Sequence, residues 1–116
     1  MVFFEDLYKT NELDELASKY NSDKKPESHN YTKIYFHYFS KIKHEKIKLL
    51  EIGVFNGASI KMWKDFFPNA TIYGLDNNSS CKQYDSERIK IFIGDQTDKE
   101  FLKNMMEEIG PVDVII

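Results

Sequence analysis

Three acidic residues follow predicted strands of the chain and could contact one ligand. Glu51, Asp76 and Asp95 lie at or near the ends of apolar segments, separated by 25 and then 19 residues. Each interval is about the length of one strand–helix unit, and the carboxyl ends of parallel strands meet at one edge of a sheet. Carboxylates at that edge can accept hydrogen bonds from hydroxyl and amine groups. We therefore expect the three side chains to face a common crevice.

The segment 48–57, KLLEIGVFNG, predicts how the backbone would meet that ligand. A buried strand runs into a turn that contains Gly53 and Gly57, and a helix opens at Ala58. Because neither glycine has a Cβ, a ligand can approach the main chain there and bind backbone N–H groups. The same pattern also fits an ordinary strand–helix turn that required two glycines.

These residues would be positioned by alternating strands and helices. The apolar patterns predict strands at 48–52, 71–75, 89–93 and 112–116. They predict helices at 11–20, 31–42 and 58–67, and a last helix that begins with a capping box from Thr97 to Glu100. A short helix near 81–87 is weakly marked. This alternation predicts an α/β fold with a parallel sheet, helices on its faces and right-handed crossovers.

The composition limits the classes of function. With 116 residues, 41% hydrophobic and 15% aromatic, the chain can form one globular core. Its net charge of −3 lacks the basic excess of a nucleic-acid binder. Its one cysteine, Cys81, fits a reducing compartment, and no apolar run approaches the roughly 20 residues of a membrane helix. We expect a cytoplasmic protein that binds a small molecule and neither nucleic acid nor membrane.

A polar loop at residues 21–30, NSDKKPESHN, precedes the aromatic helix at 31–42. It could fold over a ligand pocket, with Lys24 and His29 as polar contacts. On composition alone a solvated loop is the simpler interpretation, because charged loops usually face water.

The glycine spacing narrows the choice of ligand. A dinucleotide site needs G-x-G-x-x-G, and here Phe55 stands where the second glycine would approach a pyrophosphate. A nicotinamide-dependent oxidoreductase is therefore disfavoured. A ligand with an amino-acid tail and no phosphate is not obstructed.

These motifs together resemble the class I S-adenosylmethionine-dependent methyltransferases. The resemblance is carried by E-x-G-x-x-x-G at Glu51, by the acid that closes the second strand, and by Gly94-Asp95 after the third. The S-D-K…H-N-Y-T…Y run at 22–35, with LEIGVxxGAS and GDQTD, is similar to the group of macrolide-sugar O-methyltransferases and cephalosporin-hydroxylase-like proteins. The resemblance covers roughly residues 10–116.

The resemblance implies a partial Rossmann-like domain with the strand order 3-2-1-4. Residues 1–46 would form an N-terminal helical segment and loop, and 47–116 the first half of the cofactor-binding domain. S-adenosylmethionine would be the cofactor. The implied contacts are Gly53, Gly57 and Glu51 near its methionine moiety, Asp76 at the ribose hydroxyls, Asp95 with Gln96 at the adenine edge, and Lys24 and His29 as further contacts.

The resemblance also implies methyl transfer to a hydroxyl of a sugar or another small molecule. Relatives continue from the fourth strand into an acidic D-D-G-S-H type stretch, which this sequence does not contain. We therefore expect an N-terminal fragment with weak or no activity, and we assign no catalytic or metal-binding residue. A full-length form could also use Mg²⁺. The alternative is a non-catalytic nucleotide-binding or self-associating module, because the nearly uncharged fourth strand would be an open edge.

Overall fold

The computed structural model describes residues 10–25 and 31–116, which form one parallel sheet with helices on both faces. The strands are β1 (Lys48–Ile52), β2 (Thr71–Asp76), β3 (Ile89–Ile93) and β4 (Val114–Ile115). Their order is β3-β2-β1-β4, and all three pairings are parallel. The predicted α/β class and the predicted strand order are confirmed.

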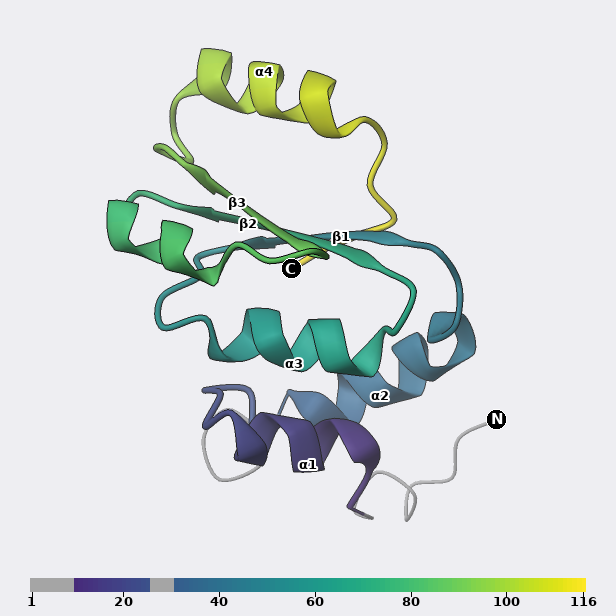
Figure 1. Ribbon diagram of the computed structural model, residues 1–116. Coiled ribbons are helices and arrows are strands. Elements are labelled where there is room, and N and C mark those ends of the chain that lie inside the picture. The colour runs from purple at the N-terminus through teal and green to yellow at the C-terminus, as the bar shows by residue number, and fades with distance from the viewer. Residues whose placement is uncertain (1–9, 26–30) are drawn as a thin grey trace.

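The helices form layers on the two sides of this sheet (Figure 1). On one side α3 (Ala58–Phe66) lies against the strands, and α1 (Glu12–Lys19) and α2 (Thr32–Phe39) lie beyond it. The opposite face is covered by α4 (Lys99–Ile109). Two short 3₁₀ helices, η2 (Ser40–Ile42) and η3 (Ser79–Tyr84), complete the described elements.

Alternation along β1 separates two apolar clusters. Leu49 belongs to the larger cluster, together with Trp63 and Phe66 of α3 and residues of α1. Leu50 belongs to the smaller one, with Met105 and Ile109 of α4. Since successive side chains of a strand point to opposite faces, Glu51 returns to the α3 side of the sheet. The pleat of β1 thus aims this carboxylate at α3.

Three predictions about individual elements need correction. Asp98, not Thr97, caps α4: its Oδ1 accepts hydrogen bonds from the N–H groups of Glu100 and Phe101, each at 3.1 Å. The Thr97 hydroxyl instead donates to Asp95, which removes it from the predicted capping box. The fourth strand covers only Val114–Ile115, and the weak helix near 81–87 is the 3₁₀ helix η3, which lies slightly earlier.

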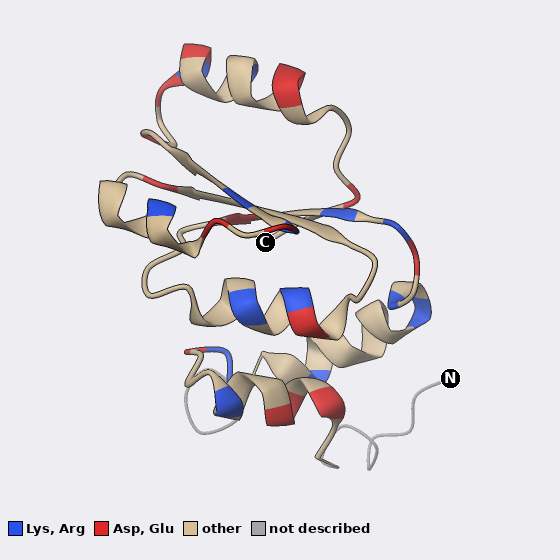
Figure 2. Ribbon diagram, viewed as in Figure 1, with Lys and Arg blue, Asp and Glu red and all other residues tan. Residues whose placement is uncertain are grey.

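Basic and acidic residues are interspersed along α1, α3 and α4 (Figure 2). This distribution matches the small net charge of the chain. Within residues 10–25 and 31–116, no helix combines the length and apolar character needed to cross a membrane.

Candidate functional site

Two adjoining cavities open at the carboxyl ends of the central strands, and Gly53 lines both. The larger has a volume of about 350 Å³, and the smaller about 210 Å³. Residues of the larger cavity come from the loop 21–25, the end of β1, the glycine turn and the start of α3. The smaller cavity is lined by the ends of β2 and β3 and the loops that follow them: Gly53, Leu75, Asp76, Asn77, Gly94, Asp95, Gln96 and Thr97.

The two glycines of the turn differ in what surrounds them. Gly53 has a φ of +90°, and a Cβ placed on it would meet no atom within 4 Å, so its backbone is open to both cavities. Gly57 has a φ of +76°, but a Cβ there would lie 2.7 Å from the ring of Tyr84. Gly57 lines neither cavity. The structure therefore places Gly53 at the site and gives Gly57 a packing role against η3.

Asp76 fastens the glycine turn to the end of β2. Its Oδ2 accepts hydrogen bonds from the N–H groups of Val54 at 2.9 Å and Phe55 at 3.0 Å, and its Oδ1 accepts one from Asn78 at 2.9 Å. Burial alone would raise the pKa of Asp76, but these backbone donors outweigh it and lower the pKa. The backbone of Asn77 acts in the same direction, so most acceptor positions of this carboxylate are directed at the chain itself.

Asp95 and Gln96 line the smaller cavity together with Gly53 of the glycine turn. The Oδ1 of Asp95 accepts hydrogen bonds from the backbone N–H of Thr97 at 2.8 Å and from its hydroxyl at 2.7 Å. These donors lower the pKa of Asp95, so the carboxyl is ionised near neutral pH. Gln96 and Thr97 line the same cavity. Asp76 and Asp95 therefore share the smaller cavity with Gly53, but Glu51, which was expected in the same crevice, lines the adjoining larger cavity.

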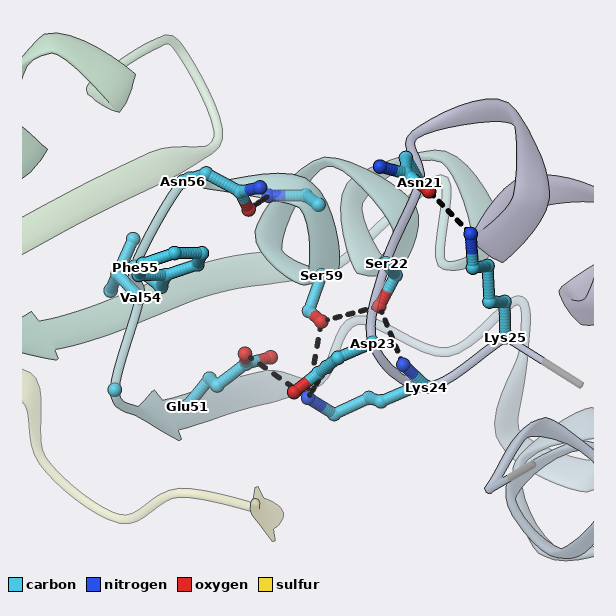
Figure 3. A pocket seen from close by; sticks show the side chains of 12 residues that line it. Asn21, Ser22, Asp23, Lys24, Lys25, Glu51, Val54, Phe55, Asn56 and Ser59 are labelled. Carbon is cyan, nitrogen blue, oxygen red and sulfur yellow. Dashed lines mark hydrogen bonds and ion pairs between the residues drawn. The ribbon is translucent and has the colours of Figure 1, made fainter. Parts of the chain in front are cut away.

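Glu51 is a buried carboxylate at the floor of the larger cavity (Figure 3). Its side chain is 3% exposed, accepts a hydrogen bond from the indole N–H of Trp63, and lies 3.5 Å from the Nζ of Lys24. Burial raises the pKa of Glu51, while Lys24 and Trp63 act in the opposite direction. The carboxylate thus lies between an α3 donor and a cation from the preceding loop.

Lys24 is held over the cavity by contacts that the sequence did not single out. Its Nζ donates to the hydroxyl of Ser59 at 3.1 Å, and its backbone N–H donates to the hydroxyl of Ser22 at 3.1 Å. The two serine hydroxyls lie 2.8 Å apart and are buried. Ser59 occupies the first turn of α3, immediately after the glycine turn. This position in the sequence could have indicated that Ser59 belongs to the site.

The side chain of Lys24 is only 13% exposed, so Lys24 lines the cavity and does not extend into solvent. His29, the other predicted contact of this loop, lies outside the described residues. No group of three or more His, Cys, Asp or Glu side chains that could hold a metal is found between residues 10 and 25 or 31 and 116.

Comparison with known proteins places this geometry in context. A mycinamicin VI 2''-O-methyltransferase of Micromonospora griseorubida is 38% identical over 112 residues, and an O-methyltransferase of Streptomyces olivaceus that acts on a rhamnosyl-tetracenomycin is 35% identical over 112. Both alignments cover 90% of this chain. The solved structure of the MycE methyltransferase in complex with Mg and SAH (S-adenosylhomocysteine) is 36% identical, with a TM-score of 0.85 over 92% of this chain. The chain resembles the sugar O-methyltransferases.

The resemblance expected from the sequence is therefore confirmed, as is the Rossmann-like fold. No protein-family model matches the chain. It spans about 28% of the length of the curated relatives and 29% of the MycE chain. This partial coverage agrees with the expected fragment.

Proposed function

We propose that this chain supplies the S-adenosylmethionine-binding part of an O-methyltransferase that acts on a hydroxyl of a sugar or another small molecule. The observation that carries the proposal is the pair of cavities that meet at Gly53, one lined by Asp76 and Asp95 and the other by Glu51 and Lys24. A nucleoside joined to an amino-acid tail has this two-part shape, and the resemblance to sugar O-methyltransferases supports the same ligand.

The smaller cavity would hold the adenosine. Asp76 would accept from a ribose hydroxyl, while its hydrogen bonds from backbone N–H groups keep the glycine turn in place. Asp95 and Gln96 would contact the adenine edge from the end of β3. The open Cα of Gly53 lets the ligand pass between the two cavities without meeting a side chain.

The larger cavity would hold the amino-acid tail. The Nζ of Lys24 donates to Ser59 at 3.1 Å and lies 3.5 Å from a carboxylate oxygen of both Glu51 and Asp23, and neither ion pair has the short distance of a good hydrogen bond. The Lys24 ammonium would contact the ligand carboxylate, and the Glu51 carboxylate would contact the ligand ammonium. Residues 1–46 would then close the cavity, through their loop 21–25, over the domain formed by 47–116.

Bound S-adenosylmethionine supplies a methyl group on a sulfonium for in-line displacement by the acceptor oxygen. The described residues bind and align the two reactants, which is a large part of catalysis in such a transfer. None of them is assigned as the base that the acceptor hydroxyl requires. We propose that this chain alone has weak or no activity, that Mg²⁺, present in the MycE complex, takes part in a longer form, and that the protein is cytoplasmic.

Titration calorimetry with S-adenosylhomocysteine tests the proposal. We expect binding to the wild-type chain and no measurable binding of NAD⁺. Lys24→Met should weaken the affinity about tenfold, since it removes a charge-assisted contact in a shielded site. Lys90→Met is the matched control: Lys90, on β3, pairs with Glu108 of α4 and lines neither cavity, so its loss should leave the affinity unchanged. Equal affinity for NAD⁺, or equal effects of both substitutions, would contradict the assignment.

A self-associating module is the second candidate, and the edge of the sheet favours it. Among the strands of residues 10–25 and 31–116, β4 pairs with β1 alone, and the Ile115 side chain is 59% exposed. Unpaired apolar edges readily accept a strand from a second copy. We propose that two chains associate through β4, a property that is compatible with cofactor binding.

A further inference from the structure

Phe55, at the tip of the glycine turn, combines an unfavourable backbone with an exposed ring. Its φ is +53°, and its side chain is 82% exposed. A bulky residue at positive φ is strained, and such strain persists only where the surroundings impose it. Exposure of a large aromatic ring brings no compensating burial. Neither feature favours phenylalanine at this position.

The backbone contacts of Phe55 account for the turn but not for the ring. The Phe55 N–H donates to Asp76 Oδ2 at 3.0 Å, and its carbonyl accepts from the thiol of Cys81 at 3.3 Å. Both contacts use main-chain atoms, so glycine or asparagine could make them with less strain. The ring belongs to neither of the two apolar clusters. The fold of the described residues therefore gives no reason for an aromatic side chain.

The location of the ring indicates what it could contact. Phe55 lines the larger cavity together with Asp23, Lys24 and Asn56, and Figure 3 shows it on the side of that cavity opposite Lys24. Since the ring is mostly exposed, it stands at the mouth of the cavity and not at its floor, where Glu51 is buried. A second reactant that reaches the cofactor from solvent would pass this mouth.

We propose that the Phe55 ring is the stacking surface for the sugar ring of the methyl acceptor. The proposal rests on the proposed function, because it assumes that the larger cavity holds the methyl donor. One face of a pyranose presents C–H groups that pack on an aromatic ring, while its hydroxyls need hydrogen-bonding partners. Asn56, next to Phe55 in the chain, lines the same cavity and can provide such a partner, whereas Asp23 lies on the opposite side, 3.5 Å from the Nζ of Lys24. A glycoside matches this mixture better than a wholly apolar acceptor does.

Saturation-transfer NMR with methyl α-L-rhamnopyranoside, a simple deoxyhexose glycoside, tests the proposal on the whole chain. We expect saturation of the aromatic protons to reach the C–H protons of the sugar. Phe55→Leu should weaken glycoside binding about fivefold, and Phe55→Tyr should retain it, because tyrosine keeps the ring and leucine keeps only the apolar bulk. Equal binding by the leucine variant, or no transfer to the sugar in the wild type, would overturn the proposal.

Phe55→Asn separates the side chain from the turn. Asparagine tolerates positive φ, so this variant should melt at a higher temperature than the wild type while losing glycoside binding. The NMR measurement is made with and without S-adenosylhomocysteine, whose own binding is followed by calorimetry. If the nucleoside fails to bind while the Phe55-dependent transfer persists, the cofactor assignment fails and the stacking surface stands. If the nucleoside binds and Phe55→Asn still holds the glycoside, the stacking surface is wrong.

Discussion

Asp76 stabilises the glycine turn at the scale of a single residue. The sequence predicted a ligand contact, because the carboxylate ends a strand at the edge where ligands bind. In the structure its two oxygens accept three backbone N–H groups, two of which belong to the turn itself. The residue therefore shapes the site before any ligand arrives.

Replacing Asp76 should destabilise the chain in a pH-dependent way. Because its pKa is lowered in the folded chain, its contribution is fully present above the unfolded value of about 3.9 and is lost as the pH falls through the folded value. We expect Asp76→Asn to cost about 2 kcal/mol of unfolding free energy at pH 7 and progressively less as the pH falls below about 4 and through the folded pKa. Urea denaturation across this pH range measures the difference, and a cost independent of pH would argue against the ionised anchor.

Glu51 should show the opposite dependence. Burial raises its pKa in the folded chain, so folding is favoured by protonation, and stability falls as the pH rises from the unfolded value of about 4.3 through the folded value. Glu51→Gln should flatten this part of the stability curve. Glu108→Gln, in an exposed ion pair on α4, should leave it unchanged. If both variants retain the wild-type slope, the buried carboxyl is not its source.

At the scale of elements, the glycine turn leads into α3 and packs against Tyr84 of η3. Gly57→Ala should destabilise the chain by about 2 kcal/mol, because the new Cβ meets both a positive φ and the ring of Tyr84. Gly53→Ala should cost about 1 kcal/mol, since only its φ is unfavourable. Thermal unfolding of both variants and of the double variant with Tyr84→Ala separates the two causes. Removal of the Tyr84 ring should restore part of the loss at Gly57 and none at Gly53.

Helices and strands with a clear periodic spacing of apolar residues could be predicted from the sequence. Features that depend on tertiary contacts could not. The strands and the inward face of α3 follow from runs of apolar residues, and the strand order follows from the family resemblance. The cap of α4 does not, because Thr97 and Asp98 are both good caps and the choice depends on the bond from Thr97 to Asp95. The pairing of Ser22 with Ser59 joins residues 37 positions apart, which no local pattern indicates.

At the scale of the whole molecule, the first two described helices are part of the main core. Leu13 and Ala17 of α1 are fully buried in the same cluster as Leu49 of β1. The loop that carries Lys24 follows directly from α1. Packing of α1 therefore helps to determine where the ammonium of Lys24 lies relative to Glu51.

The open edge of β4 carries the prediction at this scale. We expect the wild-type chain to sediment as a dimer or larger species at high concentration, and Ile115→Lys to remain monomeric, because a charge on an edge strand opposes pairing. Lys103→Ala on α4 serves as a surface control and should leave the association unchanged. A wild-type chain that stays monomeric at high concentration would rule out association through this edge.

The alternation of side chains along β1 favours the native register of β1 against β2 during folding. Leu49, Leu50 and Glu51 face the α3 layer, the α4 layer and the α3 layer in turn. A slip of one position against β2 would turn the acid toward Met105 and Ile109, where an uncompensated carboxylate is very costly. Glu51, which we propose to contact the ammonium of the ligand, therefore also disfavours a one-residue slip in the pairing of β1 with β2.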